Sequence, residues 1–150
     1  MTIIVVSANG MVADSVLIAG YRREELVFPK IIRCADGSLA GAAGRNQDCW
    51  SFTDWARRGF PDDWEMPSVD EDTFLGVRLM PDGQCRAYSS QKKWQPVALP
   101  YVIGTETACN IAWGALRMGA TPQAAVEVAI ELCISVGGNI QVEELIEIPF

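Results

Sequence analysis

The chemistry open to this 150-residue chain is limited first by a missing residue type, because the chain contains no histidine. Serine and cysteine nucleophiles that rely on an imidazole base are therefore excluded, as are metal sites built on imidazole ligands. If the chain is an enzyme, its general base must be a carboxylate, a lysine or the α-amino group. The ordinary pKa of an α-amino group is about 7.7–8.0, so the chain terminus is an available base near neutral pH.

Thr2 stands directly behind the initiator methionine, at the start of the apolar run Ile3–Val6. A threonine at a strand start can simply favour extended backbone. One reaction, however, requires a threonine at the chain terminus, because its hydroxyl is a poor nucleophile until a neighbouring base takes its proton. Thr2 therefore has a structural interpretation and a catalytic one, and the catalytic one depends on the removal of Met1.

Composition is typical of a globular protein of one domain, residues 1–150, with 49% apolar and 21% charged residues. No apolar run reaches the roughly 20 residues of a membrane span, and the first residues lack the basic region of a signal peptide. We therefore expect a cytoplasmic protein without membrane contact. The net charge of −7 argues against a nucleic-acid partner.

The cysteines are odd in number and scattered, at positions 34, 49, 85, 109 and 133. None forms a CxxC pair, so we expect reduced thiols packed as small hydrophobic groups, with no zinc site and no disulfide framework. The acidic stretch 61–72 lacks the spacing of a calcium-binding loop and is most simply a solvated loop. The sequence thus predicts no metal and no cofactor.

The hydrophobic pattern changes along the chain from strands to helices. Strands are expected at residues 2–7, 11–14, 26–34, 38–43, 73–80, 84–88, 102–105 and 140–148, with continued extended backbone at 15–20, and helices at 46–58, 107–118 and 122–132. Asn9-Gly10 is a hairpin turn signal, and Thr121-Pro122 supplies an N-cap and a proline at the first helical position. This order predicts an α/β fold, a four-layer αββα sandwich of two mainly antiparallel sheets.

Taken together, these segments resemble the proteasome β-subunit and HslV peptidase family, the N-terminal-threonine branch of the Ntn hydrolases. The resemblance spans nearly the whole chain and is carried by TIIVV, VADS, KIIR, LAGAAGRNQD, VIGTETACN and GGNIQV in that order. It implies the Ntn-hydrolase fold and self-assembly into a homo-oligomeric ring. It also implies a peptide or unfolded-protein substrate, with an ATPase unfoldase as a further partner that the family allows.

The resemblance further implies a role for five residues. Thr2 would be the nucleophile once it is the chain terminus, with its own α-amine as the base. Lys30 would place a positive charge beside the hydroxyl, and Asp14 would hold Lys30 in position. Backbone N–H groups around Gly41 and Gly44 would form the oxyanion hole, because glycine lets the substrate backbone approach closely. The chain would then be a threonine-type endopeptidase subunit.

Some positions depart from the family pattern. Cys133 and Val136, with Ser135 nearby, stand about where many members carry an aspartate and a serine before the closing Gly-Gly. Thr105-Glu106 stands where the family has Ser-Gly. Two alternatives therefore stay open, a catalytically silent member used as an assembly or structural subunit, and an Ntn amidase that acts on a small amide.

The chain has more tryptophan than one small core readily buries, and the tryptophans at positions 50, 55, 64 and 94 look exposed from the sequence. Tryptophan is enriched in protein interfaces, so some of these side chains are expected in contacts between subunits. This composition predicts a homo-oligomer.

Overall fold

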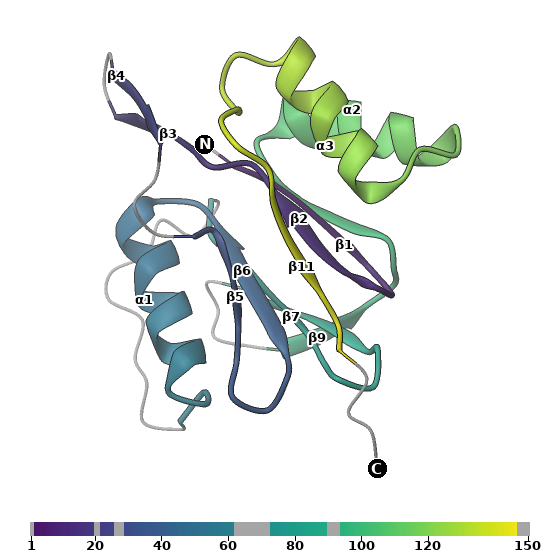
Figure 1. The fold of residues 1–150 in the computed structure, drawn as a ribbon. Helices are drawn as coiled ribbons and strands as arrows, with labels where there is room; N and C mark the ends of the chain where they lie inside the picture. Colours follow the sequence, from purple (N-terminus) through teal and green to yellow (C-terminus); the bar gives the residue numbers. More distant parts are fainter. Residues whose placement is uncertain (1, 20–21, 26–28, 62–72, 90–93, 147–150) are drawn as a thin grey trace.

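The computed structural model describes residues 2–19, 22–25, 29–61, 73–89 and 94–146 (Figure 1). Its strands are β1 Ile3–Ser7, β2 Gly10–Ala13, β3 Val16–Ala19, β4 Arg22–Glu25, β5 Ile31–Arg33, β6 Leu39–Ala43, β7 Leu75–Leu79, β8 Cys85–Ser89, β9 Trp94–Val97, β10 Tyr101–Gly104 and β11 Gln141–Glu144. Its helices are α1 Asn46–Arg57, α2 Glu106–Arg117 and α3 Pro122–Leu132.

Two antiparallel sheets lie face to face between outer layers of helices (Figure 1). One sheet has the strand order β10-β1-β2-β11 and the other has β5-β6-β7-β8-β9, while β3 and β4 form a separate pair. Helices α2 and α3 cover the outer face of the first sheet, and α1 covers the outer face of the second. The predicted four-layer αββα sandwich is therefore confirmed.

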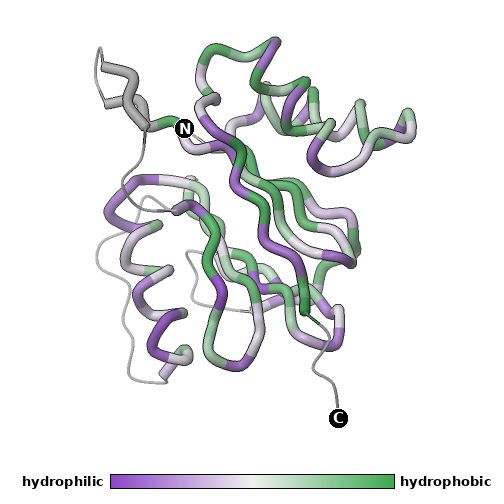
Figure 2. The backbone as a smooth tube through the Cα atoms, viewed as in Figure 1, coloured by the Kyte–Doolittle hydropathy of each residue, from purple (hydrophilic) through white to green (hydrophobic). Residues whose placement is uncertain are grey.

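Strand β1 is buried on both faces. Ile4 and Val6 lie in the core between the two sheets, whereas Ile3 and Val5 lie in the core beneath α2 and α3. A strand covered on both faces needs a continuous apolar run rather than an alternating one. This explains the apolar start of the chain, which Figure 2 shows as hydrophobic backbone in the middle of the molecule.

A third core, between α1 and the second sheet, is largely aromatic. Phe52 is fully buried, and its ring meets the rings of Trp55 and Tyr88 at centroid distances of 6.1 and 6.0 Å. A Cβ on Gly76 would lie 2.5 Å from the Phe52 ring, so glycine is needed there for α1 to reach the sheet.

The tryptophan expectation needs correction in part. Trp55 is buried and Trp94 is half-buried in this aromatic core, so both stabilise the domain itself. Trp50 is exposed on α1, and Trp113 is a further exposed tryptophan on α2. The expected tryptophan at position 64 lies outside the described residues.

The differences from the expected elements have local causes. The first hairpin turns at Ala8-Asn9, one residue earlier than expected, because Ser7 pairs with Gly10. Strand β9 was not predicted, since Pro96 interrupts its pattern, and proline is tolerated there because β9 is an edge strand. Strand β4 was not predicted because its sequence, RREE, is entirely charged. Within the described ranges, no helix combines the length and the apolar character needed to cross a bilayer.

Candidate active site

Asp14 directly follows β2 and brings distant parts of the chain together at one carboxylate. Its side chain is 0% exposed. Oδ1 accepts hydrogen bonds from Nζ of Lys30 at 2.8 Å and from the backbone N–H of Ile3 at 3.0 Å. Oδ2 accepts from the backbone N–H of Gly137 at 3.0 Å. The start of β1, the end of β2, the start of β5 and the segment before β11 therefore meet here.

Lys30 is held from both its side chain and its backbone. The side chain is 5% exposed and forms the 2.8 Å ion pair with Asp14. The Lys30 backbone N–H donates to Oε1 of Gln141, on β11, at 2.8 Å. A lysine confined in this way is a fixed positive charge, because its normally mobile chain has no room to move.

Thr2 lies beside this ion pair, one residue before the Ile3 amide that Asp14 binds. Thr2 is buried, and its carbonyl oxygen accepts a hydrogen bond from the N–H of Thr105 at 2.9 Å. Gly104 makes this approach possible, since a Cβ there would collide with the Thr2 carbonyl oxygen. The backbone of Thr2 is therefore fixed between β10 and the Asp14 carboxylate.

The two predicted glycines have different surroundings. Gly41 lies inside β6, paired with Ile31 on one side and Val77 on the other. A Cβ on Gly41 would lie 3.0 Å from the side chains of both Ile4 and Ile31, so this glycine lets the two sheets approach beside Lys30. Gly44 lies just after β6, is exposed and has a φ of 137°, a region that favours glycine.

Gly44 leads directly into the N-terminus of α1. Arg45 is the N-cap residue but makes no side-chain capping bond, and the N–H of Cys49 donates to the Arg45 carbonyl at 2.9 Å. The N–H groups before Cys49 have no acceptor within the helix, and they carry the partial positive charge of a helix start. Donors of this kind can stabilise a negatively charged oxygen.

The first turn of α1 also places two groups that the sequence analysis did not single out. Asp48 is 3% exposed, and among the described residues its Oδ2 has no hydrogen-bond partner. The pKa of the Cys49 thiol is raised to about 12, chiefly by burial and also by the charge of Asp48, while the charge of Lys30 acts in the opposite direction. Cys49 is therefore a neutral thiol near the site and is not a nucleophile. An acidic residue in a first helical turn is common, so the sequence offered no specific signal for Asp48.

The segment before β11 carries the departures noted in the sequence. Sγ of Cys133 lies 2.9 Å from Oγ of Ser135, and Val136 is buried in the core beneath α2 and α3. The contribution of this segment to the Asp14 cluster is the backbone N–H of Gly137. Cys133 and Val136, the two residues that depart from the family pattern, supply neither a carboxylate nor a second hydroxyl.

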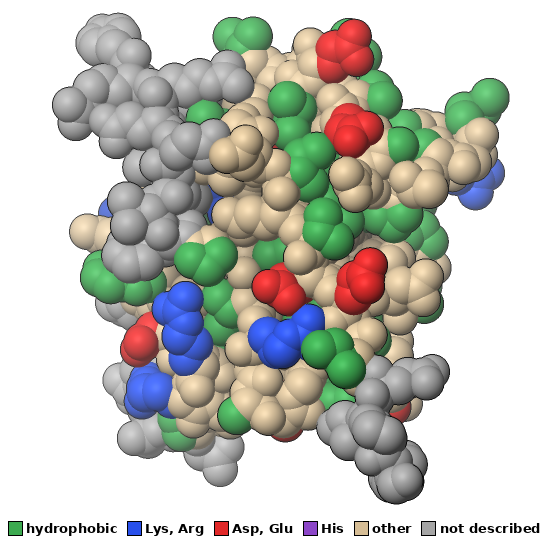
Figure 3. Space-filling model, viewed as in Figure 1, with side chains coloured by type: hydrophobic (Ala, Val, Ile, Leu, Met, Phe, Trp, Pro, Cys, Tyr) green, Lys and Arg blue, Asp and Glu red, His purple; other side chains and the backbone are tan. Residues whose placement is uncertain are grey.

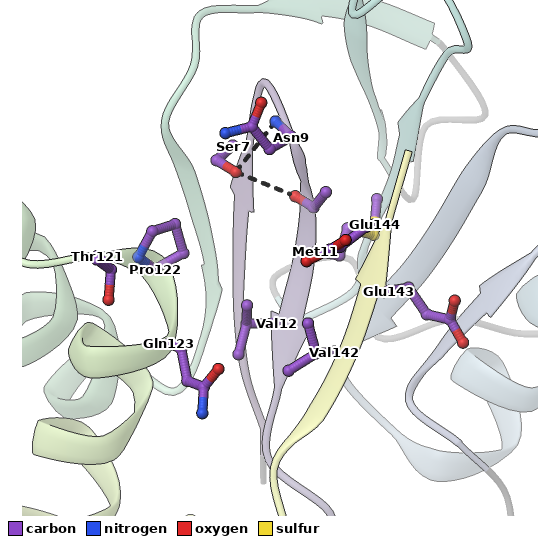
Figure 4. Close-up of a pocket in the computed structure, with 11 residues that line it drawn as sticks. Ser7, Asn9, Met11, Val12, Thr121, Pro122, Gln123, Val142, Glu143 and Glu144 are labelled. Atoms are coloured by element: carbon purple, nitrogen blue, oxygen red, sulfur yellow. Dashed lines mark hydrogen bonds between the residues drawn. The ribbon is translucent and has the colours of Figure 1, made fainter. Parts of the chain in front are cut away.

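Among the residues that the structure describes, no group of three or more Cys, Asp or Glu side chains could hold a metal ion. A separate cavity of about 280 Å³ lies at the other end of β1 (Figure 4). Val12 and Val142 line it together with Pro122 at the start of α3, with Ser7 at the hairpin end. This cavity includes none of the predicted site residues.

Solved structures share this fold. The chain matches BPH of Thiobacillus denitrificans in complex with epoxomicin at a TM-score of 0.65 and 17% identity, over 98% of this chain and 100% of that one. A second structure of the same protein gives 0.64 and 18%, over 97% and 98%. The eukaryotic HslV from Trypanosoma brucei gives 0.64 and 14%, over 95% and 97%. No family model and no curated protein matches the chain. The expected likeness to HslV is thus confirmed at the level of the fold.

Proposed function

Because the chain has the sandwich fold of HslV, we propose that it is a self-compartmentalised peptidase subunit that hydrolyses peptide bonds with Thr2 as nucleophile after removal of Met1. The observation that carries the proposal is the buried ion pair of Asp14 and Lys30, one residue from Thr2. A buried ion pair does not ordinarily stabilise a fold more than apolar side chains would. A fixed ammonium group beside a hydroxyl does favour the alkoxide form of that hydroxyl.

In the proposed reaction, the neutral α-amine of Thr2 takes the proton of the Thr2 hydroxyl through a water molecule. The hydroxyl oxygen attacks the carbonyl carbon of the substrate, and Lys30 stabilises the charge that develops. The protonated amine then gives its proton to the leaving amine, which leaves an ester on Thr2. A water molecule, activated by the same amine, hydrolyses this ester and frees Thr2.

For the oxyanion hole, we favour the N–H of Gly44 and the neighbouring N–H groups at the start of α1. They lie at an exposed helix N-terminus, whereas Gly41 lies within a sheet ladder. Gly41 supports the site indirectly, because the lack of a side chain allows Ile4 and Ile31 to approach beside Lys30.

We extend the proposal to a cytoplasmic homo-oligomeric ring that admits peptides or unfolded proteins, with an ATPase unfoldase as a candidate partner. Large apolar side chains are exposed on the helices that cover the sandwich, including Trp50, Trp113 and Met118. Such side chains support contacts with other chains. Light scattering at micromolar concentration tests this point, and a monomer would contradict the ring.

A catalytically silent structural subunit is the second candidate. The observation that favours it is the pair Cys133 and Val136, which supply neither the aspartate nor the serine that many family members carry before the closing glycines. An amidase acting on a small amide is the third candidate, since the same nucleophile would serve it.

The deciding experiment uses protein released from a cleavable N-terminal fusion so that the chain begins at Thr2, as verified by mass spectrometry. The peptidase proposal expects hydrolysis across a peptide library and its loss in Thr2→Ala. Hydrolysis of small amides without peptide cleavage would select the amidase. No hydrolysis by fully processed protein would select the silent subunit.

A further inference from the structure

We propose that the Asp48 carboxylate controls the protonation of the Thr2 α-amine, and so acts as a positioning residue for the general base of the reaction. This inference rests on the proposed function in one respect, because it needs the chain to begin at Thr2. It goes beyond that function by assigning a role to a residue outside the ion pair of Asp14 and Lys30.

The first observation is that Asp48 is buried without its full set of partners. Its side chain is almost completely enclosed, and Oδ2 finds no hydrogen-bond donor among the described residues. A buried carboxylate oxygen without a donor is costly, and native proteins rarely keep one that has no use. Asp48 therefore has an open acceptor position.

The second observation is the balance of charge around the site. Lys30 is paired with Asp14 at 2.8 Å, so these two opposite charges balance each other. Among the described residues, no cation forms an ion pair with the carboxylate of Asp48. Removal of Met1 places a new basic group, the Thr2 α-amine, at the start of β1, and its ammonium form would balance Asp48.

The third observation is that α1, which carries Asp48, packs against β5, the strand that Lys30 precedes. The Cys49 thiol, the next residue on α1, is influenced by the charges of both Asp48 and Lys30. Lys30 in turn shares Oδ1 of Asp14 with the N–H of Ile3, the residue after Thr2. The start of α1 and the start of β1 also lie at the same end of the sandwich (Figure 1).

Other ionisable groups lie on the elements around the start of β1. They are Asp14 after β2, Lys30 before β5, Arg45 and Cys49 on α1, Glu106 at the start of α2 and Cys133 at the end of α3. Arg45 and Glu106 are exposed, so water screens their charges. Cys49 is held neutral by burial. Among the described residues of this region, Asp48 is thus a buried acidic group with an oxygen, Oδ2, that has no hydrogen-bond partner.

The direction of the effect follows from the charges. A nearby carboxylate favours the ammonium form and raises the pKa of an amine. In Asp48→Asn this attraction is lost, so the pKa of the Thr2 amine should fall by about 0.5–1 pH unit. The neutral, reactive amine would then be more abundant at pH 6.5, by about 3- to 10-fold.

The test measures the amine directly and does not depend on turnover. Protein that begins at Thr2 is carbamylated with cyanate over a range of pH, and modification of the N-terminal peptide is followed by mass spectrometry. We expect the pH profile of Asp48→Asn to move to lower pH, and that of Asp48→Glu to stay close to the parent. Asp54→Asn is the matched control, because Asp54 lies on the same helix with its side chain 60% exposed.

An unchanged profile in Asp48→Asn, or an equal change in Asp54→Asn, would overturn the inference. If the parent hydrolyses peptides, the acidic limb of the pH profile of kcat/KM should shift to lower pH in Asp48→Asn, together with the pKa of the Thr2 amine. If the pKa of the Thr2 amine shifts in Asp48→Asn but neither the parent nor any variant hydrolyses a substrate, the inference holds and the proposed peptidase function fails. Circular dichroism of each variant verifies that the fold is retained.

Discussion

Two ion pairs join β5 to the facing sheet, one at each end of this short strand, and they differ in burial. Lys30, just before β5, pairs with Asp14 at 2.8 Å, with side chains 5% and 0% exposed. Arg33, the last residue of β5, pairs with Glu143 on β11 at 3.0 Å, with side chains 30% and 38% exposed. Figure 3 shows basic and acidic side chains side by side over this part of the surface.

The difference separates a pair that fits the proposed chemistry from a pair that only joins the two sheets. The buried carboxylate also binds two backbone N–H groups, so its loss would leave several partners unsatisfied. Water can replace either member of the exposed pair, and such pairs contribute about 0–1 kcal/mol. A chain that needed only to join its sheets could use the exposed type at both ends of β5.

The largest effect is expected from Asp14→Ala. This change leaves the Lys30 ammonium buried without its partner and removes the acceptor of the Ile3 and Gly137 N–H groups. The free energy of unfolding should fall by about 3–5 kcal/mol, measured by urea denaturation. A loss below about 1 kcal/mol would mean that the two ends of β5 are equivalent and would break the comparison.

Lys30→Met should separate chemistry from stability. Asp14 would keep two backbone N–H donors, so unfolding should become easier by about 1–3 kcal/mol. Peptide hydrolysis should fall at least about 100-fold, because the fixed charge beside Thr2 is gone. Lys30→Arg should also be nearly inactive, since a planar guanidinium cannot reproduce a compact ammonium in this enclosed position. Normal kcat/KM in either variant would remove Lys30 from the mechanism.

An alkaline titration sharpens the comparison at the buried end. The pKa of Cys49 is raised from its ordinary 9.0 to about 12, so the unfolded chain loses this proton at lower pH than the folded chain. The stabilisation is complete below pH 9 and is lost as the pH rises towards 12. Between pH 8 and 10 the parent should lose about 1 kcal/mol more stability than Cys49→Ala, measured by urea unfolding at each pH. Equal slopes in parent and variant would show that the thiol is not protected by burial.

The smallest effect is expected from Glu143→Gln at the exposed end. The variant keeps the length of the side chain and an oxygen that can accept from Arg33, so only the charge is lost. Unfolding free energy should change by less than about 1 kcal/mol, and hydrolysis should be unchanged. A larger loss of unfolding free energy than in Lys30→Met would mean that the exposed pair contributes more to stability than the buried pair.

The fold could be predicted largely from sequence because its signals are local. The apolar run of β1, the turn signal before β2 and the cap at Thr121 each mark an element, and the structure has all three. Thr121 Oγ1 does accept from the N–H of Ala124, at 3.1 Å. Strands β4 and β9 were missed because pairing with neighbours, rather than their own composition, makes them strands.

Only the side chains of the candidate site could be predicted from the sequence, and that prediction came from the family resemblance. Asp14 and Lys30 were proposed as partners, and the structure brings them to 2.8 Å. The N–H donors of Ile3 and Gly137 have no sequence signature, since every non-proline residue carries this group. The open acceptor on Asp48 is likewise a property of packing, which composition and spacing do not encode.

The hydrogen bond from Gly137 to Asp14 joins residues 123 positions apart. This separation determines when, during synthesis, the hydrogen bonds around Asp14 can all form. Ribosomes deliver β1 and β2 well before residue 137. Until then the carboxylate lacks one donor, and β11 is not in place to bind the backbone of Lys30. During synthesis the Asp14 cluster can therefore be completed only after residue 137 has emerged, long after β1 and β2.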